Sequence, residues 1–94
     1  MASRADAAPA LLNVTTNEWH VSIDATSADS IARVCFDRLC EEIAPMACAA
    51  GCTVEIDIPS DPSLVGGSLV PLTAQDVNGV ASDPWTIEIP NAPQ

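Results

Sequence analysis

Three segments of the chain alternate between apolar and polar residues with a period of two. They span residues 18–24 (EWHVSID), 53–58 (TVEIDI) and 85–89 (WTIEI), and Val, Ile or Trp make up the apolar side of each. A strand with one buried face and one solvent-facing side has this pattern. Such strands are usually antiparallel, because parallel strands tend to be covered and apolar on both faces. The pattern therefore predicts a mainly antiparallel sheet of at least three strands.

Residues 31–50 follow a longer period, which predicts a helix. At 100° per residue, their apolar side chains fall within one stripe roughly 140° wide, and the charged side chains fall outside it. Pro45 should kink or break this helix near its end. We expect one helix, centred on Val34–Glu42, to pack on one face of the sheet. The predicted core comprises Trp19, Val21, Ile23, Phe36, Leu39, Ile43, Val54, Ile56, Trp85 and Ile87.

The fold class predicted from these elements is α+β, with a small sheet, one helix and extended termini. Ninety-four residues are enough for one small domain. We divide the chain into an extended N-terminal arm at residues 1–14, a single α+β domain at residues 15–90 and a tail at residues 91–94. Within the domain, Asn78-Gly79 predicts a type I′ hairpin, and Pro71 makes "SLVPL" an edge strand, because proline cannot donate to a ladder.

The charge balance limits the range of partners. The chain has 13 acidic residues, three arginines and no lysine, which give a net charge of −10. Such a surface repels phosphate backbones and anionic lipids, so we expect no direct binding to nucleic acid or to membranes. The N-terminus "MASRADAAPALLNV" lacks the apolar region of a signal peptide, so we expect the protein in a reducing cytoplasm and not in a secretory compartment. In a reducing cytoplasm, the sequon Asn13-Val14-Thr15 would have no role and thiols would stay free.

The four cysteines lie within residues 35–52, in the predicted helical segment. On a helix, Cys35 and Cys40 would lie about 8.5 Å apart between Cα atoms, beyond the disulfide limit of about 7 Å. The spacing C-x4-C-x7-C-x3-C matches no common zinc or iron–sulfur pattern. We therefore expect free thiols packed in the core. A disulfide that involves Cys48 or Cys52 and a metal site remain as alternatives.

The residues offer little for catalysis. The chain has one histidine, no lysine and no tyrosine, and it has no glycine-rich phosphate loop. Asp76, Asn78 and Asp83 lie in a stretch that lacks the further acids of a calcium loop, and the Asn-Gly turn explains the same residues. We predict a protein that is not an enzyme, and we assign it no catalytic residue, no cofactor and no metal.

The arm "MASRADAAPALLNV", the three alternating segments and the tail "PWTIEIPNAPQ" together resemble the small decoration or cement proteins of tailed-phage heads. The resemblance implies a structural protein that binds a larger protein surface, with the major capsid protein as partner and self-association into a homo-oligomer. The location it implies is a virion or the host cytoplasm. Apolar residues of the terminal segments would make the contact, namely Leu11, Leu12, Val14 and Ile89. The alternative function is an acidic DNA mimic that inhibits a nucleic-acid-binding protein.

Overall fold

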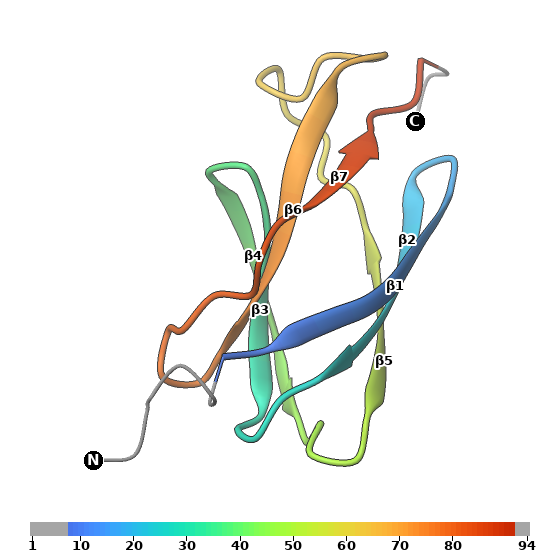
Figure 1. The fold of residues 1–94 in the computed structure, drawn as a ribbon. Helices are drawn as coiled ribbons and strands as arrows, with labels where there is room; N and C mark the ends of the chain where they lie inside the picture. The colour runs from blue at the N-terminus through green and yellow to red at the C-terminus, as the bar shows by residue number, and fades with distance from the viewer. Residues whose placement is uncertain (1–7, 92–94) are drawn as a thin grey trace.

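The computed structural model describes residues 8–91, which form seven strands and contain no helix (Figure 1). The strands are β1 (Ala10–Asn17), β2 (His20–Thr26), β3 (Ile31–Phe36), β4 (Leu39–Met46), β5 (Cys52–Asp57), β6 (Leu69–Asp76) and β7 (Trp85–Glu88). They make two sheets, a three-stranded sheet in the order β1-β2-β5 and a four-stranded sheet in the order β4-β3-β6-β7. Every pairing within them is antiparallel. The predicted α+β class was therefore wrong, whereas the antiparallel pairing was expected.

The chain crosses between the two sheets three times, after β2, after β4 and after β5. The result is a sandwich with a Greek-key order of strands, similar to the order in immunoglobulin-like β-sandwiches. A fold of this kind hosts many functions, so function must be argued from particular sites. Among residues 8–91, no helix is long and apolar enough to cross a membrane.

The segment predicted as a helix forms the hairpin of β3 and β4. Val34 and Phe36 point into the core, and Asp37-Arg38 makes a two-residue turn before β4 returns along β3. Two short strands joined by such a turn can place apolar residues at spacings that also fit a helical stripe, so the period alone was ambiguous. Pro45 lies within β4, which is an edge strand, where the missing N–H costs no ladder hydrogen bond.

The β1–β2 and β3–β4 hairpins both turn through two residues other than Asn-Gly. The β1–β2 hairpin turns at Glu18-Trp19 and the β3–β4 hairpin turns at Asp37-Arg38. The first turn residue has a positive φ in each, 55° at Glu18 and 59° at Asp37. A residue with a side chain can adopt this left-handed conformation at a modest cost, and Asp tolerates it better than most.

The core fills the space between the two sheets. Val21, Ile23, Phe36, Val54 and Ile87 are buried as predicted. The other predicted core residues, which are partly buried and pack against it, are Trp19, Leu39, Ile43, Ile56 and Trp85. Further buried hydrophobic residues outside the predicted core list are Ala25, Ile31, Val34, Cys48, Ile58, Leu64, Val70, Leu72, Ala74 and Ile89.

Strand β6 differs from the prediction, because it lies inside its sheet between β3 and β7. The pairing of β6 with β3 ends at the partners Phe36 and Leu72. Pro71 is the next residue of β6 beyond that pair, so it is tolerated there. The carbonyl of Pro71 then accepts a hydrogen bond from the Asp37 amide, 2.7 Å away. The Asn78-Gly79 turn is present, but only Gly79 has a positive φ, so it is not the predicted type I′ turn.

The cysteines form two disulfides, Cys35–Cys40 and Cys48–Cys52, and none is free. The expectation of free thiols was wrong because it rested on the helix. In the hairpin, Cys35 and Cys40 are direct cross-strand partners with Cα atoms 4.0 Å apart. The alternative that involved Cys48 or Cys52 describes the second disulfide, which closes a five-residue loop from Cys48 to Cys52.

The boundary of the predicted arm also shifts. Residues 1–7 of the arm and residues 92–94 of the tail lie outside the described residues. The remainder of the arm, from Ala10 onward, forms the first half of β1 and pairs with β2. The sandwich therefore begins within the predicted arm.

The two disulfides can be tested directly by counting thiols and by mapping the cysteine pairs. Denatured protein should show no reactive thiol before reduction and four after it, and peptide mapping should find the pairs Cys35–Cys40 and Cys48–Cys52. Loop closure predicts that replacing both cysteines of one pair by Ala lowers the free energy of unfolding by about 2 kcal/mol. Four reactive thiols in unreduced protein, or a different pairing, would contradict the structure.

Candidate functional site

Three connections gather at one end of the sandwich, the lower end in Figure 1, where β1 also begins. They are residues 27–30 between β2 and β3, residues 47–51 between β4 and β5, and residues 77–84 between β6 and β7. We call this surface the loop end. Loops that a rigid sheet scaffold presents together are common binding sites in β-sandwiches.

The connection between β4 and β5 is held in place by Cys48. Its side chain is 1% exposed and packs with the core, and its sulfur bonds to Cys52 at the start of β5. Its carbonyl accepts the amide of Gly51 at 3.1 Å, which closes a tight turn through Ala49 and Ala50. Gly51 has a φ of 101°, a conformation that favours glycine.

The connection between β6 and β7 is ordered by a buried carboxylate. Asp76 is 2% exposed, and its Oδ1 accepts the amides of Asn78 at 2.9 Å and Val80 at 3.0 Å. The Asp76 amide in turn donates to the Val80 carbonyl at 3.1 Å. Further along, the amide of Ser82 donates to Ala74, and its hydroxyl accepts the Ala74 amide. These bonds fix the loop onto the end of β6.

Hydrogen bonds also join the three loops to one another. The Ser27 amide donates to the Cys48 carbonyl at 3.0 Å, which links the first two loops. The Val77 amide donates to the Ser30 carbonyl at 2.9 Å, which links the first and third. Asn78 adds a side-chain bond to Asp29 at 3.0 Å. The loop end is therefore one connected surface.

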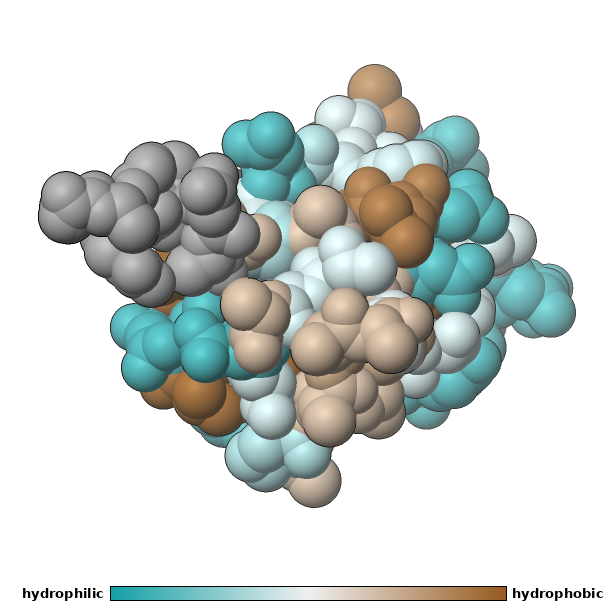
Figure 2. Space-filling view, turned by 60° about the horizontal axis from the view of Figure 1, so that its bottom comes forward, coloured by the Kyte–Doolittle hydropathy of each residue, from teal (hydrophilic) through white to brown (hydrophobic). Residues whose placement is uncertain are grey.

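Small apolar side chains dominate the exposed part of this surface. Val77 and Val80 are 53% and 38% exposed on either side of the Asn-Gly turn. The exposed alanines are Ala28, Ala47, Ala49, Ala50 and Ala81. Figure 2 turns this end toward the viewer and shows brown and tan residues across its middle, with teal residues around them. In a chain with a net charge of −10, this end is comparatively apolar.

The residues predicted to bind a partner are not gathered in one place. Ile89 is fully buried, and Leu11 and Val14 are half-buried against the core. Leu12 is 59% exposed, because a register shift between Leu11 and Asn13 turns it out of the ladder. The premise that apolar residues of the termini are poorly buried therefore holds for Leu12 alone among these four. The loop end was missed because its loops carry no motif, and the Asn-Gly pair was its only local signal.

The outer face of the three-stranded sheet carries a polar cluster. His20 on β2 contacts Asp57 at 3.0 Å through Nδ1 and Glu55 at 2.5 Å through Nε2, both on β5. Hydrogen bonds to Asp57 and Glu55 raise the pKa of His20 above its ordinary value, and bonds from His20 and Ser22 lower the pKa of Glu55. All of these groups are solvent-exposed, so the cluster makes no enclosed reaction site.

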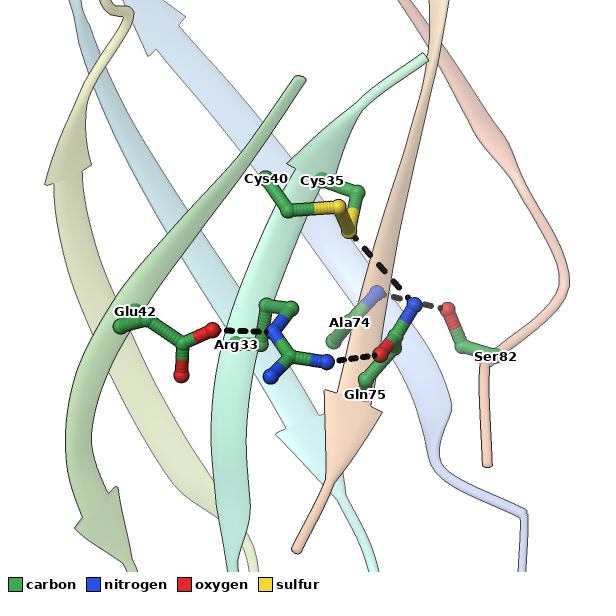
Figure 3. The surroundings of a disulfide bond; sticks show 7 residues. All are labelled: Arg33, Cys35, Cys40, Glu42, Ala74, Gln75 and Ser82. Atoms are coloured by element: carbon green, nitrogen blue, oxygen red, sulfur yellow. Dashed lines mark hydrogen bonds and ion pairs between the residues drawn. A yellow bond between two sulfur atoms is a disulfide. The ribbon is translucent and has the colours of Figure 1, made fainter. Parts of the chain in front are cut away.

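The outer face of the four-stranded sheet carries a second cluster, shown in Figure 3. Arg33 on β3 bonds to Glu42 on β4 at 2.5 Å and to Gln75 on β6 at 2.9 Å. Gln75 also points its Nε2 at the sulfur of Cys35, 3.6 Å away. The cluster ties three neighbouring strands together beside the Cys35–Cys40 disulfide, and its charges compensate one another.

The residues weighed as a calcium loop have other roles. Asp76 binds backbone amides, and Asn78 binds Asp29. Within residues 8–91, no three His, Cys, Asp or Glu side chains are grouped so that they could hold a metal ion.

Comparison with models of known protein families gave no match, and a search among curated proteins also gave none.

The polar cluster predicts a titration. His20 should titrate above its ordinary pKa of 6.5 when its ring signals are followed by NMR, and D57N and E55Q should each lower that pKa. The contribution of His20 to stability is fully present below its ordinary pKa and is lost as the pH rises through the raised value. The contribution of Glu55 is lost as the pH falls through its lowered pKa, so the ion pair stabilises the fold between these two values. An ordinary pKa for His20 that neither substitution changes would contradict the contacts.

Proposed function

We propose that this chain is a non-enzymatic binding module that attaches to the surface of a larger protein assembly through its loop end. The observation that carries this proposal is the combination of an exposed apolar surface with loops that are already fixed in place. Cross-loop hydrogen bonds and the Cys48–Cys52 disulfide hold that surface before any partner arrives.

Fixed loops favour binding because little conformational entropy is lost on association. The exposed side chains there are mainly Ala and Val, which lose little or no rotamer freedom when they are covered. Interfaces have an apolar centre depleted of charge and a polar rim, and the loop end has this composition. Asp29 and Asp83 supply negative charge within it, which suits a partner with a complementary basic rim.

The assembly that the sequence resemblance favours is a virion shell, with the major capsid protein as the partner. Disulfides persist on virion surfaces and in other oxidising settings, whereas reduced cytoplasm keeps thiols free. The two disulfides therefore support the outside of a virion over the host cytoplasm as the working location. Homo-oligomer formation on such a shell remains part of the proposal.

The acidic DNA mimic receives less support from the geometry. A mimic needs carboxylates that are free to meet basic groups of its target. On the three-stranded sheet, Glu55 and Asp57 already contact His20, and Asp24 accepts the Thr53 hydroxyl at 2.8 Å.

Two matched substitutions test the proposed function. Val77→Asp places a charge in the loop end, and Val65→Asp places the same charge in the β5–β6 connection at the opposite end, where Val65 is 62% exposed. Co-sedimentation with purified shells that lack this chain should show at least about tenfold weaker attachment for V77D and little change for V65D. Circular dichroism and thermal melting should show both variants folded.

Deletion of residues 1–7 tests the separate contribution of the terminal arm without removing β1.

For the matched substitutions, equal attachment of V77D and wild type, or an equal loss in V65D, would contradict binding through the loop end.

A further inference from the structure

Strand β1 presents an Asn-x-Thr sequon on the surface of the sandwich. The sequon is Asn13-Val14-Thr15, and its middle residue is not proline. Asn13 and Thr15 are both exposed and, two residues apart on one strand, lie on the same outer face. Val14, between them, points the other way and packs against the core. Within residues 8–91, neither polar side chain takes part in a hydrogen bond or ion pair.

The position of β1 leaves room for a large group on Asn13. This strand is an edge of its sheet, with β2 as its one neighbour there. The register shift between Leu11 and Asn13 interrupts the ladder immediately before the sequon. Asn13 is therefore an exposed side chain on an edge strand, where a bulky substituent can extend into solvent.

The two disulfides supply the second, independent observation. N-glycosylation takes place in compartments that also form disulfides, and a reducing cytoplasm supports neither. The sequon was expected to have no role because the N-terminus lacks the apolar region of a signal peptide, which pointed to a reducing cytoplasm. With Cys35–Cys40 and Cys48–Cys52 formed, the chain has the bonds of a protein that folds in an oxidising compartment.

We propose that Asn13 is an N-glycosylation site. The co-substrate is an oligosaccharide linked to a polyprenyl diphosphate, presented by a membrane-bound oligosaccharyltransferase. The Asn13 Nδ2 forms a bond to the sugar C1, and the bond between C1 and the diphosphate oxygen breaks. The amide loses one proton, the polyprenyl diphosphate leaves with the electron pair of the broken bond, and no oxidant or reductant is needed.

An open hollow lies beside Asn13. Asn13 follows the exposed Leu12 and lies opposite Asp24 in the ladder. Both of these neighbours line an open hollow of about 370 Å³, together with Ala25, Gly51, Cys52 and Thr53. A sugar attached at Asn13 would cover Leu12 and keep a second strand from pairing with the edge of β1. This inference does not depend on the proposed binding at the loop end, and it requires passage through an oxidising secretory compartment, which a shell protein made and assembled in a reducing cytoplasm would not enter.

The test expresses the full chain behind a cleavable secretion signal in a eukaryotic host. Intact mass is measured on the secreted protein and on the protein retained in the endoplasmic reticulum, so that poor export cannot hide the result. Most molecules with both disulfides should carry extra mass that a peptide N-glycosidase removes, leaving Asp at position 13. N13Q and T15A should abolish the extra mass, and T15S should keep it.

Asn17 provides the matched control, because it is exposed on the same strand and followed by Glu18-Trp19, which makes no sequon. N17Q should keep the extra mass. Disulfide-bonded protein of unmodified mass in both fractions would overturn the proposal, and so would extra mass that persists in N13Q.

Discussion

The arrangement of the loop end depends on Cys48, where the chain passes from one sheet to the other. Its side chain is buried with the core, its sulfur is bonded to Cys52, and its carbonyl accepts the amides of Ser27 and Gly51. Its sulfur also lies 3.2 Å from the carbonyl oxygen of Ala25, near the end of β2. One residue therefore connects the core, the crossover between sheets and the adjacent loop.

The remainder of the molecule works as a scaffold for this end. The inner faces of the two sheets pack against each other. The outer face of the three-stranded sheet carries the polar cluster around His20, and that of the four-stranded sheet carries the cluster around Arg33. The charges in both clusters are largely paired. Paired, solvated charges favour solubility more than recognition. The loop end differs from both faces, because most of its exposed side chains are small and apolar while backbone hydrogen bonds join its loops to one another.

The sequence predicted those parts of the fold that depend on local alternation. Strands β2, β5 and β7 were located, because one face of each is buried and the other is wet, and the predicted core residues lie in or against the core. The hairpin of β3 and β4 was missed, since its turn lacks glycine and its apolar spacing also fits a helix. That error carried over to the cysteines, because the distance between Cys35 and Cys40 depends on the assumed backbone. The loop end could not be predicted, because it is formed by residues from three connections that only the topology brings together.

Amide hydrogen exchange at Ser27, in wild type and in C48A/C52A, tests most directly whether Cys48 fixes the loop end. Ser27 lies in the connection that precedes β3, and its amide donates to the carbonyl of Cys48. We expect slow exchange in the oxidised wild type and exchange faster by about 30-fold in the double variant, because the disulfide contributes about 2 kcal/mol. Amides of the core strands, such as that of Ile23, should remain protected in both proteins. Fast exchange of Ser27 in the oxidised wild type would contradict a fixed loop end.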